Sequence, residues 1–130
     1  MGQTDLPTPD EIIVTHEEIE EQYDLKYRGI RVTAPRLVLR RLLEGAEELS
    51  GEYLQGAFLL RKLITEHLFE DGNKRTAWVT IREFLLSADL RPAETGERVP
   101  HILRRIRRYE IDELAEWLET GEIDEDRLHP

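Results

Sequence analysis

The sequence predicts an all-α fold, a compact bundle of about six helices in which a polar loop joins the two central helices. Apolar residues recur at helical spacing along most of the 130 residues, and no segment alternates as a strand would. Pro35, Gly51 and Gly121 separate the periodic segments. A length of 130 residues favours a single domain over residues 1–130, long enough to bury a core.

The helix boundaries follow from capping signals and from breaks in the pattern. Thr8 is expected to cap the first helix, with Pro9 at its first position and Glu11 completing a capping box. Residues 26–35 are expected to form a loop, and residues 1–7 and 122–130 to be flexible tails. We expect helices over 9–24, 35–49, 52–68, 75–88, 100–108 and 112–119.

The third and fourth predicted helices, 52–68 and 75–88, carry apolar residues around most of their circumference. Such helices are buried, so we place both near the centre of the domain. Trp78 in the fourth helix and Trp117 in the last one are spaced with other apolar residues, which predicts core positions for both rings. His16 lies on the apolar face of the first helix, and we expect a core or boundary residue there.

The composition limits the environment of the chain. No apolar run reaches the roughly 18 residues that span a bilayer, and no secretory signal opens the sequence, so we expect a cytoplasmic protein without a membrane partner. The absence of cysteine excludes disulfides and thiolate metal sites. Fifteen arginines against three lysines, in an acidic chain, are typical of proteins from salt-loving organisms.

The net charge of −10 is unevenly distributed. Residues 1–24 contain eight acids and no base, and residues 110–130 contain nine acids and one base. Residues 25–109 contain seventeen bases and eleven acids. A basic middle favours an anionic ligand there, although pairing of the two acidic ends with the arginines explains the same pattern.

The basic middle contains a polar stretch, residues 67–77, between the two central helices. A glycine turn that opens a helix leaves backbone N–H groups free, and Gly72 precedes the predicted fourth helix, so an anion site is expected. Lys74 and Arg75 add two positive charges, and a guanidinium can hold a phosphate through two hydrogen bonds. Asp71 would repel a phosphate unless a hard cation such as Mg²⁺ lay between them.

Two further residues complete the parts for phosphate chemistry. His67, expected at the end of the preceding helix, could accept a proton from a hydroxyl nucleophile. Phe69 is expected to anchor the turn in the core. Together these parts indicate phosphoryl or nucleotidyl transfer, with a charge-rich solvated turn as the alternative.

The pattern His-x-Phe-x-Asp-Gly-Asn-Lys-Arg, from His67 to Arg75, resembles the signature of the Fic/Doc family. The resemblance implies that His67 is the base that activates a target hydroxyl and that Asp71 holds Mg²⁺. It also implies that Gly72 and Asn73 form the anion hole for the nucleotide phosphates, and that Arg75 binds phosphate.

The stretch Asn-Lys-Arg-Thr-Ala, residues 73–77, is similar to the Doc (death on curing) branch of that family. AMP-transferring Fic proteins carry glycine at the position of Lys74 and a second arginine at the position of Trp78. Doc proteins share the lysine, and they are toxins that transfer the γ-phosphate of ATP to a threonine of a translation elongation factor. Gly72 departs from Doc, which tends to have alanine there, so Fic-type AMP or NMP transfer stays open.

The resemblance also implies a regulatory partner. The Ser/Thr-x-x-x-Glu-Gly/Asn helix of self-inhibiting Fic proteins has no match in the chain. Doc proteins are inhibited instead by an antitoxin that folds onto them as a helix, and we expect such a partner. The alternative that is not an enzyme is a Doc-like fold that serves only as a binding or regulatory subunit.

Other cations are left without an assigned function. Arg31, in the loop after the first helix, could orient the motif or bind a partner. Arg104, Arg105, Arg107 and Arg108 form a basic cluster that we expect to pair with neighbouring acids. We therefore do not expect direct binding of nucleic acid.

Overall fold

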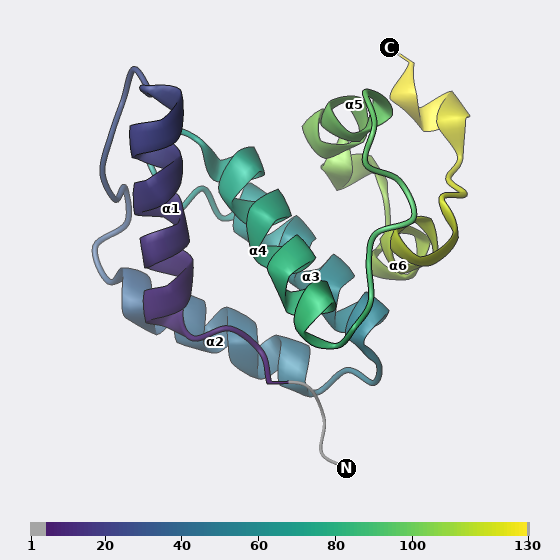
Figure 1. Ribbon diagram of the computed structural model, residues 1–130, viewed down its shortest axis with the longest axis horizontal. Helices are drawn as coiled ribbons and strands as arrows, with labels where there is room; N and C mark the ends of the chain where they lie inside the picture. The colour runs from purple at the N-terminus through teal and green to yellow at the C-terminus, as the bar shows by residue number, and fades with distance from the viewer. Residues whose placement is uncertain (1–4, 130) are drawn as a thin grey trace.

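The computed structural model describes residues 5–129, which form six α-helices and two short 3₁₀ helices, η1 and η2 (Figure 1). The all-α prediction is confirmed, since no strand forms in this part of the chain and one isolated bridge joins Ile30 to Phe69. The elements are α1 (Pro9–Tyr23), α2 (Pro35–Glu47), α3 (Glu52–Thr65), α4 (Asn73–Ser87), α5 (Arg98–Arg104), η1 (Ile106–Arg108), α6 (Ile111–Thr120) and η2 (Glu125–Leu128).

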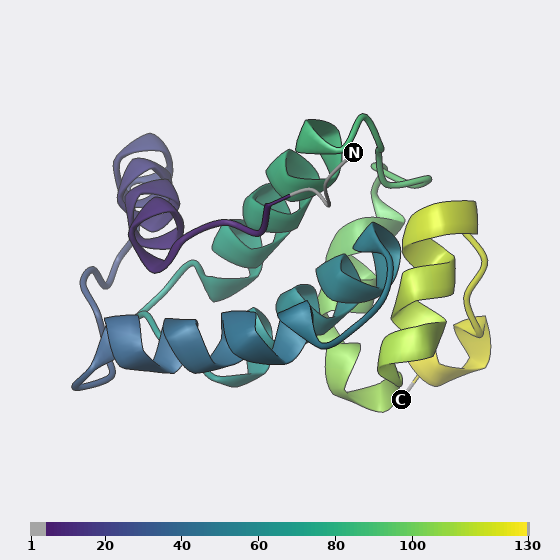
Figure 2. The ribbon, with the colours of Figure 1, turned by 90° about the horizontal axis from the view of Figure 1, so that it is seen from below.

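The helix α3 lies at the centre, packed against α4 on one side and α6 on another. The helix α1 stands beside α4, and α2 crosses beneath both (Figures 1 and 2). Leu59 and Leu60 of α3 are fully buried, as are Ala77, Ile81 and Leu85 of α4. The predicted central position of these two helices is therefore confirmed.

The start of α1 follows the predicted capping box. The backbone N–H of Glu11 donates to Thr8 Oγ1 at 3.1 Å, and the N–H of Thr8 donates to Glu11 Oε1 at 2.8 Å. Two of the donors that a helix start leaves unpaired are satisfied in this way. Pro9 occupies the first helical position, where no N–H is needed.

The boundaries around the polar stretch differ from the prediction. The helix predicted to reach residue 68 ends at Thr65, and the next one begins at Asn73 rather than Arg75. His67 is consequently not at a helix end but in the loop, with a left-handed φ of 53°. The helix ends early because Leu68 and Phe69 turn inward to positions that are 0% and 1% exposed.

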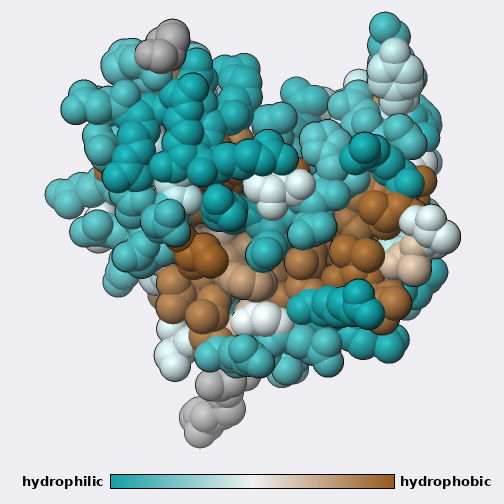
Figure 3. Space-filling model, turned by 180° about the vertical axis from the view of Figure 1, so that it is seen from behind, coloured by the Kyte–Doolittle hydropathy of each residue, from teal (hydrophilic) through white to brown (hydrophobic). Residues whose placement is uncertain are grey.

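Three apolar residues that lie at helical spacing with buried ones are exposed. Leu86 is 58%, Leu37 44% and Tyr23 43% exposed, so helical spacing alone overestimated the buried face of each helix. On the side of the molecule opposite to the view of Figure 1, apolar side chains form a band between two hydrophilic regions (Figure 3).

No helix in residues 5–129 is long and apolar enough to cross a membrane.

The end segments make contacts where the structure describes them. Residues 1–4 and 130 of the expected tails lie outside the described residues. Leu6, Ile123 and Leu128 pack against the core, and the hydroxyl of Tyr109 donates to the carbonyl of Asp124 at 2.9 Å. The segment after Gly121 is thereby attached to the body of the domain.

Candidate functional site

Six of the seven predicted site residues line one cleft of about 610 Å³. The cleft lies between the end of α1, the loop before α4, the outer face of α4, and α5 with the loop before it. Phe69 is the exception, since it is 1% exposed beneath the loop, as its structural assignment predicts. The predicted residues that line the cleft are His67, Asp71, Gly72, Asn73, Lys74 and Arg75.

The loop is fixed by its own asparagine and by the segment that follows α1. Asn73 Oδ1 accepts from the N–H of Phe69 at 3.1 Å, and Asn73 Nδ2 donates to the Phe69 carbonyl at 2.9 Å. On the other side, the N–H of Arg31 donates to the carbonyl of Leu68 at 2.8 Å, and the N–H of Glu70 donates to Gly29 at 3.1 Å. These bonds hold the loop in one conformation before any ligand arrives.

The same bonds change what two residues can do. Because the side-chain amide of Asn73 is engaged with Phe69 and the residue is only 8% exposed, its contribution to an anion site must come mainly from its backbone N–H. Arg31 reaches the loop through its backbone, and its side chain is exposed. The backbone bond at position 31 orients the motif loop whatever the side chain, so both functions considered for the arginine side chain stay predictions.

The N-terminus of α4 is an open anion cradle. The first helical bond joins the N–H of Thr76 to the Gly72 carbonyl at 2.9 Å, so Asn73, Lys74 and Arg75 have no helical carbonyl to receive their N–H groups. No side chain caps this end. The partial positive charge of the helix end adds to the charges of Lys74 and Arg75.

Gly72 has a local structural reason to be glycine. Its φ of 77° is left-handed, and a Cβ there would approach Leu25 Cδ1 to 2.8 Å and His16 Cε1 to 3.6 Å. Alanine would be strained by the backbone conformation whatever the space. The left-handed backbone and the side chains behind the loop both favour glycine, so this departure from the Doc pattern has a local structural reason that does not depend on ligand approach.

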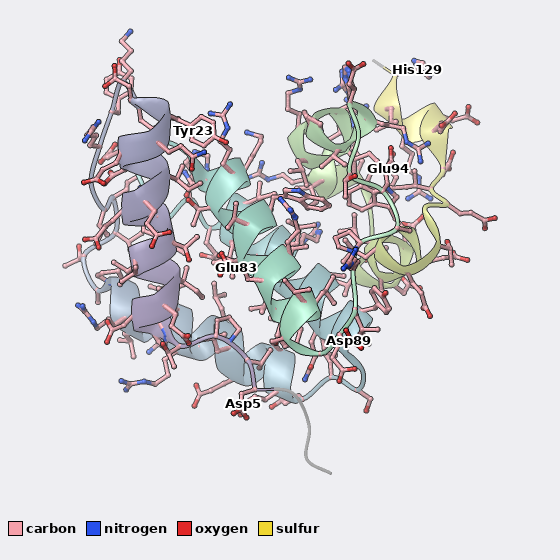
Figure 4. The ribbon with its side chains drawn as sticks, in the orientation of Figure 1. Asp5, Tyr23, Glu83, Asp89, Glu94 and His129 are labelled. Carbon is pink, nitrogen blue, oxygen red and sulfur yellow. The ribbon has the colours of Figure 1, made fainter. Side chains whose placement is uncertain are left out.

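Arg75 is held by an aromatic ring. Its guanidinium lies 4.0 Å from the centroid of Tyr23, the last residue of α1. Figure 4 shows Tyr23 at the end of α1 nearest to the start of α4. Such a cation–π contact restricts the exposed arginine and leaves its N–H groups available at the ring edge. Tyr23 therefore forms part of the wall of the cleft.

His16 lies directly behind the loop. Its ring stacks on Phe69 with centroids 3.7 Å apart and planes 8° apart, and its Nδ1 lies 2.9 Å from Thr76 Oγ1. Its Nε2 is 3.3 Å from Glu20, within ion-pair distance but without hydrogen-bond geometry. The predicted buried position is confirmed at 2% exposure, and the contacts give His16 a supporting function for both the loop and α4.

Burial lowers the pKa of His16 below its ordinary value of 6.5, while Glu20, Glu17 and Asp71 oppose that shift. The unfolded chain therefore takes up a proton at His16 at a pH where the folded protein does not, and stability falls as the pH falls below 6.5. We expect His16→Gln to have a weaker loss of stability in this range than the wild type, measured by urea denaturation from pH 7.5 to 5. His101→Gln, at an exposed position on α5, should keep the wild-type slope, and an unchanged slope in His16→Gln would contradict the assignment.

Comparison with protein-family models gives a match to the Fic/DOC family over residues 1–85. The chain belongs to this family. No curated protein matches the chain. The matched Fic/DOC segment contains α1 to α3, the motif loop and most of α4, so the part of the cleft wall formed by α5 and the loop before it lies beyond the match.

Fic/DOC enzymes generally transfer nucleotide groups to proteins, and they use ATP and typically Mg²⁺. The residues present here fit such an ion. Asp71 lines the cleft and one of its carboxylate oxygens accepts from the Gly72 N–H at 2.8 Å, so the other can face a ligand. Residues 5–129 contain no group of three metal-ligating side chains. A site with one carboxylate is typical of Mg²⁺ shared with phosphates.

Several lining residues were not assigned to the site from the sequence. Trp78 was expected in the core, Arg104 in a solvated cluster, and Arg82 had no assignment, yet all three line the cleft. The signal for Arg82 was present, because Lys74, Trp78 and Arg82 follow each other at four-residue spacing and share one helix face. Arg104 comes from α5, and only the fold brings it to the motif.

Proposed function

We propose that this protein is a Doc-like protein kinase, the toxin of a toxin–antitoxin pair, which transfers the γ-phosphate of ATP to a Ser or Thr hydroxyl of a translation elongation factor. The observation that carries the proposal is the placement of His67 and Lys74 in one cleft with the open N-terminus of α4. A base, an anion cradle and positively charged side chains are the parts that phosphoryl transfer requires.

In the proposed step, His67 accepts the proton of the target hydroxyl, whose oxygen forms a bond to the γ-phosphorus. The bond from that phosphorus to the β–γ bridging oxygen breaks, and ADP leaves with the electron pair. The phosphorylated protein, ADP and protonated His67 are the products, and the imidazolium then loses its proton to water. The N–H groups of α4, Lys74 and Arg75 stabilise the charge on the phosphate oxygens. Mg²⁺ held by Asp71 would reduce the repulsion between this carboxylate and the phosphates.

Lys74 favours phosphoryl transfer over AMP transfer. It occupies the position of the glycine in AMP-transferring Fic proteins, and its side chain is expected to crowd the phosphate path that those enzymes use. Trp78 replaces their second arginine and removes a phosphate ligand from the cleft. The Fic-like Gly72 carries less weight for the alternative, since packing against Leu25 gives a separate reason for it.

The proposal includes a partner and a location. An antitoxin that supplies an inhibitory helix would act in the cytoplasm with this toxin, and its gene is expected next to the gene for this chain. The alternative function is that of a binding subunit without catalysis. It predicts that an intact His67 is not needed for toxicity.

Purified protein incubated with a translation elongation factor, Mg²⁺ and γ-labelled ATP should transfer label to a Ser or Thr of that factor. Chelation of Mg²⁺ by EDTA should remove the transfer, because the carboxylate of Asp71 then repels the phosphates. Peptide mapping of the labelled factor checks the acceptor residue. Failure of the wild-type protein to transfer label to the factor, under conditions where it binds ATP, would contradict the proposed substrate.

A further inference from the structure

One glutamate of α1 differs from its neighbours. Three glutamates close to it in the helix are exposed, namely Glu17, Glu18 and Glu21. The side chain of Glu20 is 14% exposed, and its Oε2 atom lies next to two polar groups. The N–H of Gly29 donates to this oxygen at 2.6 Å, and Nε2 of His16 lies 3.3 Å from it. A carboxylate that is taken out of water needs such partners, so these two contacts account for the inward position of Glu20.

The carboxylate of Glu20 determines which nitrogen of His16 carries the proton. A neutral imidazole has one N–H and one nitrogen with a free lone pair. If Nε2 were unprotonated, its lone pair would face a negatively charged oxygen, so Nε2 carries the proton and Nδ1 is the acceptor. The hydroxyl of Thr76 then donates to Nδ1 across 2.9 Å. Glu20, His16 and Thr76 thus form a chain from α1 to the first turn of α4.

A carboxylate, an imidazole and a hydroxyl in this order are also the parts of an activated nucleophile. Thr76 is 1% exposed and His16 is 2% exposed, so no substrate reaches this hydroxyl. The chain of three residues therefore holds the surrounding structure in place and is not a second catalytic centre.

The same oxygen of Glu20 also holds the connection between α1 and α2. Gly29, whose N–H binds this oxygen, accepts through its carbonyl from the N–H of Glu70 at 3.1 Å. The backbone bond from Arg31 to the residue after His67 extends the same contact. Glu20 is therefore joined to the loop that carries His67 through two consecutive hydrogen bonds.

The loop needs this support at His67. Its φ of 53° is left-handed, a conformation that residues other than glycine adopt at a cost, so contacts around the loop must maintain it. The backbone of the loop is bound to Gly29, and the ring of His16 stacks on Phe69 with centroids 3.7 Å apart. Both supports lead back to the carboxylate of Glu20.

We infer that Glu20 is a positioning residue for the transfer reaction. Its carboxylate holds the loop of His67 through its contacts with Gly29 and His16. The inference rests on the proposed function, in which His67 is the base. Glu20 does not line the cleft, and the N–H groups of the anion cradle belong to α4. Its loss should therefore slow the transfer step and leave nucleotide binding unchanged.

Glu20→Ala removes both contacts and should lower kcat for label transfer to the elongation factor by up to about 100-fold, the effect of moving a catalytic group by about 1 Å. The KM for ATP, and the affinity for ADP measured by calorimetry, should equal those of the wild type. Glu20→Gln should recover part of the rate, since its amide oxygen can accept from the N–H of Gly29. The control is Glu21→Ala, which removes the same charge at an exposed position of the same helix and should keep the wild-type rate.

Two NMR measurements separate positioning from a general loss of stability. The imidazole nitrogen shifts of the wild type should show His16 with a protonated Nε2 and an unprotonated Nδ1 at neutral pH, and Glu20→Ala should lose this preference. Amide hydrogen exchange at Gly29 and Glu70 should become faster in Glu20→Ala, while the amides of α3 keep their protection. Glu21→Ala should match the wild type in both measurements.

An unprotonated Nε2 of His16 in the wild type would overturn the inference, whether or not any variant folds. A wild-type kcat in a folded Glu20→Ala protein would also overturn it, as would a fall in kcat with unchanged exchange at Gly29. A wild-type protein that transfers no label defeats the proposed function, and the positioning of its base with it. Transfer by the wild type that does not depend on Glu20 defeats the inference alone.

Discussion

Replacing His67 by alanine is expected to lower the rate of transfer by about 10²- to 10⁴-fold, the usual contribution of a general base. His67 lines the cleft beside the open end of α4, where a hydroxyl would meet the phosphate. The side chain is exposed and makes no hydrogen bond within residues 5–129, so its loss should not unfold the protein. The measurement is kcat at saturating ATP, with thermal unfolding followed in parallel.

His101→Ala is the matched control, since His101 is an exposed histidine of α5 that does not line the cleft. It should retain the wild-type rate. Activity or toxicity that persists in His67→Ala would contradict the catalytic assignment and favour the binding-subunit interpretation.

Replacing Phe69 by alanine is expected to lower the free energy of unfolding by about 3 to 5 kcal/mol, the cost of removing a buried phenyl ring. Phe69 is 1% exposed and stacks on His16, and its backbone groups are the ones that Asn73 holds. The cavity would therefore lie directly beneath the loop that carries His67. Urea denaturation measures the loss, which is a large part of the 5 to 15 kcal/mol typical of a domain.

Two comparisons isolate the effect of the ring. Phe69→Leu keeps much of the buried apolar volume and should cost clearly less than alanine. Leu86→Ala removes an apolar side chain that is 58% exposed, and it should change the unfolding free energy by less than about 0.5 kcal/mol. A loss in Phe69→Ala no greater than that of Leu86→Ala would show that Phe69 does not anchor the loop.

Local sequence signals predicted most of the helices well, because these have their own caps or breaks. The helix expected over 100–108 is an exception, since it begins at Arg98, ends at Arg104 and is followed by the separate 3₁₀ helix η1. The capping box of Thr8 and Glu11, Pro35 at the start of α2, and Gly121 after α6 are all found where the sequence placed them. The loop before α4 was less accurate. Its helix boundaries depend on Leu68 and Phe69 entering the core, which is a tertiary preference that local propensity does not contain.

The sequence predicted the site residues that are close together in the chain, and it missed those that other parts of the fold bring to the cleft. The residues from His67 to Arg75 share one loop and one helix start, so their chemistry could be inferred from spacing. Trp78 has the same helical spacing as a core residue, and only the position of α5 shows that part of its ring lines a cleft. The support from His16 likewise depends on packing between residues 60 positions apart.

We propose that the γ-phosphate of ATP, and not its AMP group, is transferred from this cleft. One reaction tests this choice, with ATP that carries different isotopes at the α and γ positions and with both isotopes counted in the modified target protein. We predict γ label in the target and no α label, with both absent in His67→Ala. Transfer of α label alone would contradict the account and establish AMP transfer in its place.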